Sequence, residues 1–450
     1  MTITIAQAVC RPSNATKSQQ VWIGVVAVAA MLMFTLAGRT SAIGPAGPGW
    51  EPRELVATGI DPNDQAGGDR ILAFDHHGEP GIAFKGAMDF GDIQYARDHA
   101  GIGWAAQDLF PSTGTVGRGA FASLAFDRHE RPAISFRSAD GQVVDSSLRF
   151  SHFDGQDWQH QIVESIQNQN VGTWTSLAFD REGRPAIVYL DESNDRLRFA
   201  YDHDGDFDFS GLLPETIDAF GGGVEANYVS LGFDPLNRPM VSYVTTDNEL
   251  YFAMKETLGW LVTAIDTNEI TFETASSLAI DPDTGYPAIA YTAQGGSASL
   301  KYAQWDGNDW NLATVDAVGS TGAQPSLAFD PTDGNPAIAY HRLDSGDLKI
   351  AWHDGTLWQD SVVDPNSGGT AVGLSPSIAF REFGVGDRVA AIAYHDDSGN
   401  VFYIEDPPIV SVPEPAAALL ISSGTAVTLL HRRRRSARQF ICDFKRTFAR

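Results

Sequence analysis

Ser123-Leu-Ala-Phe-Asp127 is a short stretch that returns along the chain at intervals of about fifty residues. Close copies end at Asp180, Asp234, Asp281 and Asp330, and more divergent copies are Ile71-Leu-Ala-Phe-Asp75 and Ser377-Ile-Ala-Phe-Arg381. The last residues of successive copies are 52, 53, 54, 47, 49 and 51 positions apart. A repeat this regular predicts seven copies of one structural unit.

Each unit contains four short apolar runs separated by turn residues. After Asp180, the turn Arg-Glu-Gly-Arg-Pro185 leads into Ala186-Ile-Val-Tyr189, and a third run follows at Leu197-Arg-Phe-Ala200. In most units a turn such as Asp154-Gly-Gln-Asp-Trp158 opens a fourth run. The runs alternate like strands and show no sustained helical period, so a helical solenoid is excluded. Four strands per unit are typical of a propeller blade.

The two ends of the array are complementary. The seventh unit has three strands, at residues 377–380, 389–394 and 401–404, and then stops without a Trp-led strand. One such strand, Trp50–Ala57, precedes the first unit. We therefore predict an all-β, seven-bladed β-propeller over residues 50–406, with four antiparallel strands per blade, closed by Trp50–Ala57 joining the last blade.

The first 42 residues have the pattern of a secretory signal peptide. Arg11 and Lys17 precede an apolar stretch from Val21 to Leu36, and small residues suited to cleavage follow Arg39. Residues 43–49 then form a linker. The alternative is an uncleaved anchor helix, for which the apolar stretch is short.

The C-terminal residues 412–450 follow a linker at 407–411. They contain Pro413-Glu-Pro415, an apolar segment at 416–430, and a basic tail that begins with four consecutive arginines. This order resembles the PEP-CTERM sorting signal of exported bacterial proteins. The resemblance implies processing by a membrane-embedded, exosortase-like enzyme and delivery to the cell surface, envelope or extracellular matrix. The matching positions are Pro413, Glu414, Pro415, Arg432, Arg433, Arg434 and Arg435.

Composition restricts the partners. The chain has 57 acidic and 31 basic residues, a net charge of −26, and its two basic ends make the middle more acidic still. A nucleic-acid partner is therefore excluded, since phosphate binding requires cations. Contact with a membrane is expected only through the terminal segments. Both cysteines, Cys10 and Cys442, lie in those segments, so we expect no disulfide in the mature protein.

The Asp-Gly-x-x-Trp turns resemble the Asp-box hairpins of sialidase-like propellers, which link the third and fourth strands of a blade. That resemblance supports the fold. A sialidase would also need three arginines converging on a substrate carboxylate, a Tyr paired with an acid, and a free Asp. Arg131, Arg184 and Arg238 precede the Pro of the hairpin turn, where we expect them in solvent. No convincing arginine triad is present.

Candidate ligand-binding residues lie at the start of the repeated strand. Two positions before the repeated Ser, three consecutive units carry Phe121, Trp174 and Tyr228. We expect these aromatic side chains on the face with the longer, more variable loops, where sugar rings or peptide side chains could stack. Packing between blades is the alternative.

Asp202, Asp204, Asp206 and Asp208 place four carboxylates at alternate positions. Such an oxygen-rich loop is a candidate Ca²⁺ site. Ordinary turn chemistry with surface carboxylates is the alternative. No other cofactor is expected, because the histidines lack metal-ligand spacing.

Together these features predict an exported bacterial surface or matrix propeller that acts as a non-catalytic binding module for carbohydrate or an envelope protein. The repeat also resembles fucose-binding propeller lectins, as in Leu148-Arg-Phe-Ser-His-Phe-Asp-Gly-Gln-Asp-Trp158. The alternative is a sialidase-like glycoside hydrolase or a polysaccharide lyase on the same fold.

Overall fold

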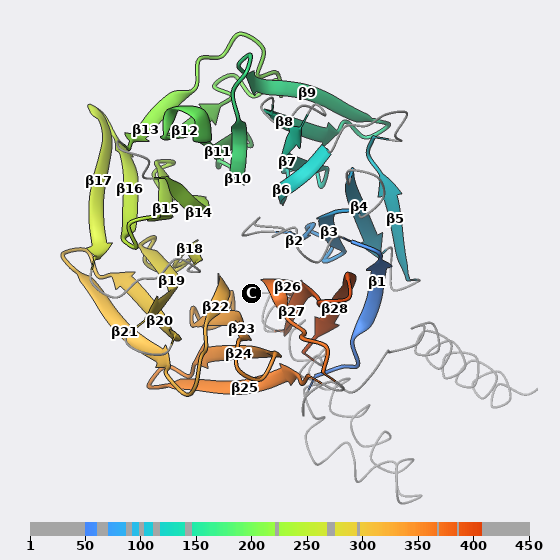
Figure 1. Cartoon of the computed structure of the whole chain (residues 1–450), viewed down its shortest axis with the longest axis vertical. Helices are drawn as coiled ribbons and strands as arrows, with labels where there is room; N and C mark the ends of the chain where they lie inside the picture. Colours follow the sequence, from blue (N-terminus) through green and yellow to red (C-terminus); the bar gives the residue numbers. More distant parts are fainter. Residues whose placement is uncertain are drawn as a thin grey trace, which may run out of the picture. The chain divides into compact units, whose positions relative to one another are not determined.

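The computed structural model describes residues 50–60, 71–86, 92–98, 103–110, 118–139, 146–220, 225–267, 275–294, 298–366, 369–384 and 387–406. Over these ranges, seven four-stranded antiparallel sheets surround a central axis (Figure 1). The described part of the chain has a single helix, the 3-10 turn η1 (Glu192–Asn194). The all-β, seven-bladed prediction is confirmed.

The first four blades follow the chain from the centre of the ring outward. Blade 1 contains β2 (Leu72–Phe74), β3 (Pro80–Lys85), β4 (Ile93–Asp98) and β5 (Trp104–Asp108). Blade 2 contains β6 (Arg118–Phe126), β7 (Pro132–Ala139), β8 (Ser146–Phe153) and β9 (Trp158–Ser165). Blade 3 contains β10 (Val171–Phe179), β11 (Pro185–Asp191), β12 (Arg196–Tyr201) and β13 (Glu215–Ala219). Blade 4 contains β14 (Ala226–Phe233), β15 (Pro239–Thr245), β16 (Leu250–Glu256) and β17 (Gly259–Asp266).

The last three blades complete the ring. Blade 5 contains β18 (Ser276–Ile280), β19 (Pro287–Gln294), β20 (Ala298–Trp305) and β21 (Trp310–Asp316). Blade 6 contains β22 (Ala323–Phe329), β23 (Pro336–Arg342), β24 (Asp347–His353) and β25 (Trp358–Asp364). Blade 7 contains β26 (Leu374–Gly384), β27 (Asp387–His395), β28 (Asn400–Glu405) and, on its outer edge, β1 (Glu54–Thr58).

β1 pairs antiparallel with β28, from Glu54 opposite Tyr403 to Thr58 opposite Asn400. β1 begins at Glu54 and not at Trp50, where the sequence predicts its start, and it ends at Thr58, one residue after the predicted Ala57. Before it, the backbone N–H of Glu51 donates to the carbonyl of Glu405 at 3.0 Å, which places Trp50 beside blade 7.

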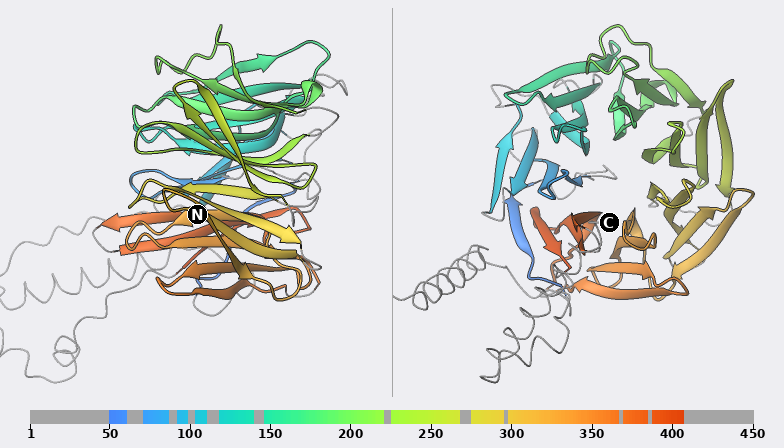
Figure 2. Two further views of the ribbon diagram at one scale, coloured as in Figure 1. Left: turned by 90° about the vertical axis from the view of Figure 1, so that its left-hand side faces the viewer. Right: turned by 180° about the vertical axis from the view of Figure 1, so that it is seen from behind.

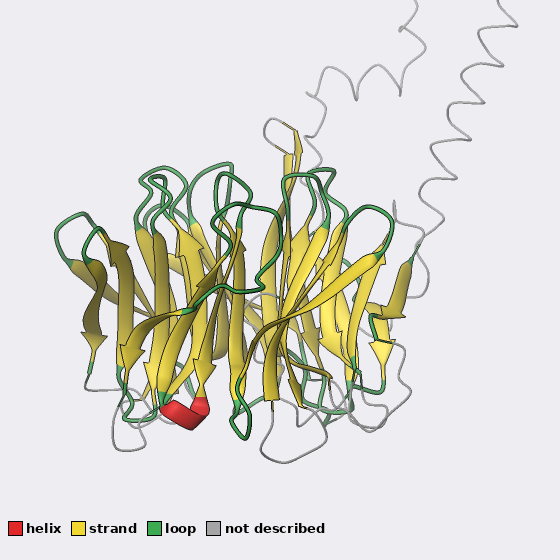
Figure 3. Cartoon of the chain, turned by 90° about the horizontal axis from the view of Figure 1, so that it is seen from above, coloured by secondary structure: helices red, strands yellow, loops and turns green. Residues whose placement is uncertain are grey.

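The connections divide the ring into two faces, seen from the side in Figures 2 and 3. The turns between the first and second strands and between the third and fourth strands share one end, the turn face. In the first-to-second turn of blade 3, the Asp180 carboxylate accepts the Arg184 N–H at 2.9 Å, and Gly183 supplies a φ of 82°. The described parts of the remaining connections, including η1, lie at the opposite end, the loop face.

Apolar side chains fill the spaces between blades. One cluster joins Val188 and Leu190 of blade 3 to Leu231 and Val241 of blade 4, all at 0% exposure. Because each sheet buries both faces against its neighbours, the hydrophobic effect holds the blades side by side.

The repeated serine has a specific role at the inner edge of the ring. Its buried hydroxyl accepts a hydrogen bond from the backbone N–H of the Leu or Ile one position further along the motif in the next blade. Distances are 3.0–3.2 Å for Ser123–Leu177, Ser176–Leu231, Ser230–Leu278, Ser277–Leu327, Ser326–Ile378 and Ser377–Leu72. The last bond joins blade 7 to blade 1. These bonds satisfy N–H groups that the innermost strands cannot pair within their own sheets.

Candidate functional site

The predicted aromatic residues occupy an unusual backbone conformation. Phe121, Trp174 and Tyr228 have φ values of 56°, 51° and 50°, in the left-handed region that non-glycine residues seldom adopt. Each lies in a register shift of its inner strand, as between Thr173 and Ser176. Gln324 and Ser375 hold the same conformation in blades 6 and 7, so this bulge belongs to the repeat and does not require an aromatic side chain.

The structure brings the three rings together. The Phe121 and Trp174 ring centroids are 4.7 Å apart, and those of Trp174 and Tyr228 are 4.2 Å apart. Trp174 also packs against the apolar cluster between blades 3 and 4. Each ring is half-buried, so part of the row is exposed. The rings thus contribute to packing between blades, and a stacking role for ligands stays a prediction.

The acidic turn brings three of its four carboxylates together. Oxygens of Asp202, Asp204 and Asp206 lie within 4.8 Å of one another. Asp202 is buried and accepts the N–H groups of Gly205 and Phe207 at 2.9 and 2.8 Å, and burial raises the pKa of its carboxyl group. The Asp208 carboxylate instead accepts the N–H and hydroxyl of Ser210. These bonds are those of a capped turn, and calcium binding stays a prediction.

The turn arginines are bound more closely than expected. Arg131, Arg184 and Arg238 each form an ion pair of 2.6–2.7 Å with the buried Asp four residues earlier: Asp127, Asp180 and Asp234. Their side chains are only 28–36% exposed. The arginines lie on the turn face, as expected, and each is partly exposed, but an ion pair with a buried turn carboxylate fixes its guanidinium group.

Paired tyrosines and acids occur throughout the ring. In blades 3 to 7 a buried Tyr of the second strand donates its hydroxyl to an acid on the outer strand of the preceding blade, at 2.5–3.0 Å. The pairs are Tyr189–Glu164, Tyr243–Asp218, Tyr291–Asp266, Tyr340–Asp316 and Tyr394–Asp364. Blades 1 and 2 carry Phe84 and Phe136 instead of the tyrosine. The outer-strand positions equivalent to the acid then hold Ala57 and Phe110. Since the pair recurs at successive junctions, it is part of the packing and marks no single reaction centre.

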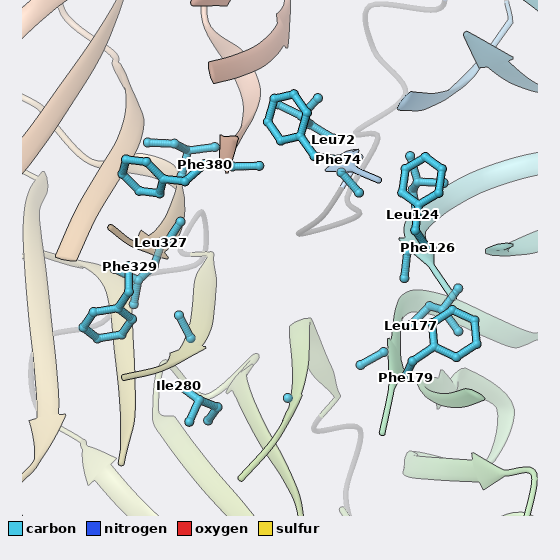
Figure 4. Close-up of a pocket in the computed structure, with 18 of the residues that line it drawn as sticks. Leu72, Phe74, Leu124, Phe126, Leu177, Phe179, Ile280, Leu327, Phe329 and Phe380 are labelled. Carbon is cyan, nitrogen blue, oxygen red and sulfur yellow. The ribbon is translucent and has the colours of Figure 1, made fainter. Parts of the chain in front are cut away.

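The central channel contains a cavity of about 640 Å³, lined by the repeated Leu-Ala-Phe stretches. Figure 4 shows Phe74, Phe126, Phe179, Phe329 and Phe380 around it, with Ile280 at the equivalent position of blade 5. The lining is mainly apolar and has few side chains that could orient a polar ligand. The channel is therefore a weak candidate for a specific polar site.

Six junctions between blades share an aromatic pair that the seventh lacks. A ring that lies on the outer strand of one blade, or in blade 3 in the connection before it, meets a third-strand ring of the preceding blade edge to face. The centroids are 5.0–5.4 Å apart. The pairs are Trp104–Tyr403, Trp158–Tyr95, Phe209–Phe150, Trp260–Phe199, Trp310–Phe252 and Trp358–Tyr302. Between blades 6 and 7 the two positions hold Trp50 and Ile350, which lie in one cluster. Because the Ile350 side chain is smaller than an aromatic ring, it leaves unfilled part of the space that a third-strand ring occupies at the other junctions.

A pocket of about 280 Å³ opens at this junction on the turn face. Its apolar lining includes Trp50, Ile350 and Trp352, and Trp352 is 38% exposed. The polar lining residues are Asp330, Asp333, Asn335, His353, Ser361 and Asp406. We call this cavity the blade 6–7 pocket. Sequence analysis missed it, although aligning the third strands would have shown Ile350 as the exception in a series of aromatic residues.

Hydrogen bonds hold the polar wall in place. The Asp333 carboxylate accepts the N–H of Asn335 at 3.0 Å, and the carbonyl of Asn335 accepts the N–H of Asp330 at 2.8 Å. His353 Nδ1 accepts the N–H of Gly355 at 3.2 Å, so in the neutral ring Nε2 carries the proton and can donate. Two indole rings and several fixed polar groups around one cavity are suited to a ligand with an apolar face and hydroxyl edges.

The expected signal peptide at residues 1–42 and the sorting motif around Pro413, Glu414 and Pro415, with Arg432 to Arg435, lie outside the described residues. Among the residues that the structure describes, none belongs to a helix long and apolar enough to cross a membrane.

Comparisons with known proteins support the fold. No protein-family model matches the sequence, and no curated protein matches it. Among solved structures, an ulvan lyase described as a polysaccharide lyase, bound to a saccharide, is similar with a TM-score of 0.50 and 14% identity, over 79% of this chain and 95% of the lyase. At this identity the likeness shows a shared propeller fold and nothing about the reaction.

Two further structures are less similar. An α-L-arabinofuranosidase from Fusarium graminearum has a TM-score of 0.48 and 11% identity, over 65% of this chain and 93% of the enzyme. The protein AofleA from Arthrobotrys oligospora has a TM-score of 0.41 and 13% identity, over 70% of this chain and 96% of that chain. Propeller enzymes are thus among the structural neighbours, at low identity.

Proposed function

We propose that this chain is an exported, non-catalytic carbohydrate-binding propeller of the bacterial cell surface or matrix, and that the blade 6–7 pocket is its saccharide site. The observation that carries this proposal is the pairing of Trp50 with Ile350. Six equivalent junctions hold a pair of rings, whereas this one holds a single ring and Ile350, next to a cavity that an exposed Trp lines.

The lining of the pocket supports a saccharide in particular. A pyranose has an apolar face, which can stack on an indole ring such as that of Trp352, and a rim of hydroxyl groups. The carboxylate of Asp333, the side-chain amide of Asn335 and Nε2 of His353 can accept from and donate to such hydroxyl groups. These groups lie on strand ends and tight turns, so little ordering is needed on binding.

Export rests on the two ends of the chain. We infer that the signal peptide at residues 1–42 directs secretion and that an exosortase-like enzyme processes the tail. Replacing Pro413, Glu414 and Pro415 together by Ala should leave the unprocessed chain in the membrane fraction of a host that has the enzyme. Immunoblotting of cell fractions measures this, and equal processing of the changed chain would refute the sorting role.

The binding proposal is tested by isothermal titration with a panel of defined oligosaccharides. Trp352→Ala should weaken binding at least about tenfold, the loss of roughly 1.4 kcal/mol of stacking. Ile350→Phe, which restores the ring found at Phe252 and Tyr302, should fill the pocket and abolish binding while the protein stays folded. Trp305→Ala, on the same face of blade 5, is the matched control and should bind normally.

The same panel addresses the enzymatic alternative. Product analysis after incubation should show each oligosaccharide intact, without hydrolysis or an unsaturated product of elimination. Turnover that is lost on changing a single carboxylate would refute a non-catalytic role. Unchanged binding in both Trp352→Ala and Ile350→Phe would refute this pocket as the site.

A further inference from the structure

The innermost strands of all seven blades line the cavity of the central channel. The last apolar position of the repeated motif holds Ile280 in blade 5 and a phenylalanine in the other six blades, and each of these side chains is partly exposed. The phenylalanines are Phe74, Phe126, Phe179, Phe233, Phe329 and Phe380, and Figure 4 labels all of them except Phe233. Seven partly exposed apolar side chains around one cavity form a surface that a bound apolar molecule removes from water.

The cavity is broad for its depth. Its lining runs along three successive motif positions, as in Leu177, Ala178 and Phe179, which correspond to about 10 Å of strand. With a volume of about 640 Å³ over that depth, the cavity is wider than a single alkyl chain. Its shape is therefore suited to a compact ring system, and the phenylalanine rings can meet such a ligand edge to face.

One cation lies at the mouth of the cavity on the turn face. Arg181 is exposed in the first-to-second turn of blade 3, and it is the only Lys, Arg or His among the described lining residues. Its backbone N–H donates to the side chain of Asn237 at 2.9 Å, and its guanidinium group forms no ion pair with any described residue.

The acid next to this cation is already neutralised. Asp180 is the only Asp or Glu among the described lining residues, and its carboxylate lies 2.6 Å from Nη2 of Arg184. The same carboxylate accepts the Tyr201 hydroxyl at 2.6 Å. The guanidinium group of Arg181 is therefore available at the mouth for an acidic group that comes from outside the chain.

We propose that the central cavity binds a molecule with a fused apolar ring system and one acidic group, and that Arg181 binds the acidic group. The ring system lies among the phenylalanines, and the acidic oxygens accept from the guanidinium group at the mouth. The negative charge of the whole chain opposes anions elsewhere, so the apolar rings supply most of the binding energy. This site is separate from the blade 6–7 pocket, which shares only Phe380 with it among the described lining residues.

The test uses two fluorescent probes with the same ring system, titrated into the full chain. One is 1-anilinonaphthalene-8-sulfonate, an anion, and the other is N-phenyl-1-naphthylamine, which lacks the sulfonate and is neutral. The apolar ends of the chain bind such probes equally in every variant, so the affinities are compared between variants.

The first variant tests the cation. Arg181→Gln should weaken binding of the sulfonate probe about fivefold and leave binding of the neutral probe almost unchanged. Arg128→Gln is the matched control, because Arg128 holds the equivalent position in blade 2, is exposed, and does not line the cavity. It should change the affinity for neither probe.

The second variant tests the rings. Phe179→Ile combined with Phe329→Ile removes two of them, and it should weaken both probes at least about tenfold. Blade 5 folds with Ile280 at the same position, so the doubly substituted protein should stay folded. Circular dichroism checks this.

Each contrary result removes a defined part of the inference. Unchanged binding of both probes in the doubly substituted protein would overturn the cavity as the site. Unchanged binding of the sulfonate probe in Arg181→Gln would overturn the acidic ligand class. An equal loss in Arg128→Gln and Arg181→Gln would show a general effect of charge and would also overturn the role of Arg181.

Discussion

Arg53 and Asp364 lie 311 residues apart in the chain, yet Nη1 of the arginine is 2.6 Å from Oδ2 of the aspartate. The pair connects the segment before β1 to the outer strand of blade 6, and the Tyr394 hydroxyl donates to the same oxygen at 2.6 Å. The Asp364 side chain is only 1% exposed. The first prediction concerns the stability of the protein when this buried carboxylate loses Arg53, its positive partner.

Arg53→Met should destabilise the protein by about 3 kcal/mol at about pH 7, because it leaves a buried charge without its cation. Burial already raises the pKa of Asp364 against the opposing effects of Tyr394 and Arg53. Removing Arg53 raises that pKa further, so the destabilisation should shrink as the pH is lowered and Asp364 becomes protonated. Urea denaturation at several pH values measures the effect. Arg196→Met, at an exposed position, is the control; an equal loss in both variants would contradict the role of the pair.

The serine hydroxyl bonds at the inner edge of the ring make the second prediction. Ser176→Ala removes the acceptor for the buried N–H of Leu231. Leaving that group without a partner should cost about 1–3 kcal/mol in the free energy of unfolding. Thr356→Ala removes an exposed hydroxyl and should change stability by less than about 0.5 kcal/mol. If the two substitutions lowered the denaturation midpoint equally, the bond between blades would have no special role.

The third prediction concerns Trp174 and distinguishes a role in packing between blades from a role in stacking against a ligand. Because its ring packs on Phe121, Tyr228 and the cluster between blades 3 and 4, Trp174→Ala should cost about 3–5 kcal/mol. Trp352→Ala, at a more exposed position, should change stability by only about 0.5 kcal/mol. Thermal and urea denaturation measure both. A stable Trp174→Ala protein with weakened oligosaccharide binding would instead favour the stacking role predicted from the sequence.

The buried turn carboxylates make the fourth prediction, on acid stability. Burial opposes ionisation of Asp180, but the Tyr201 hydroxyl and Arg184 hold the pKa of its carboxyl group below the ordinary value of 3.8. The folded state therefore binds fewer protons than the unfolded state near that pH, so stability is present above about pH 4 and is lost as the pH falls through the folded pKa.

Asp180→Asn should accordingly lower stability at about pH 7 and make the acid loss shallower. Denaturation midpoints between about pH 2.5 and 7 give the slope. Asp157→Asn, at an exposed site, should leave the slope as it is in the original protein. An unchanged slope in Asp180→Asn would assign the acid loss to other carboxylates.

Local chemistry explains why most of the fold could be predicted from the sequence. The turn at Asp180 contains its own carboxylate cap and Gly183, so each hairpin is specified within a few residues. The length of the repeat and the alternation of apolar residues then specify four strands per blade. The start of β1 was less well predicted, because residues 50–53 have strand-like composition but lie beside blade 7 before the ladder begins at Glu54.

Features that arise between blades could not be read from single segments. Nothing in the residues around Trp174 requires a left-handed φ, although Gly172, whose added Cβ would meet the backbone of Leu148, indicates a close approach there. The ion pairs of the turn arginines could not be predicted either. The burial of Asp127 and its equivalents depends on the neighbouring blade, which the local sequence does not show. The blade 6–7 pocket depends on Trp50 and Ile350, which are three hundred positions apart, and only the closed ring brings them together.

Blade 1 carries Ile71 at the position where six other blades carry the serine of the inner ring of hydroxyl bonds. An isoleucine cannot accept the N–H of Leu124, and its side chain packs instead in the apolar cluster shared with blade 7. Among the described residues, the inner edge between blades 1 and 2 therefore lacks this hydroxyl bond, which every other pair of neighbouring blades has. When the protein is heated or pulled by its ends, the ring should therefore open first between blades 1 and 2.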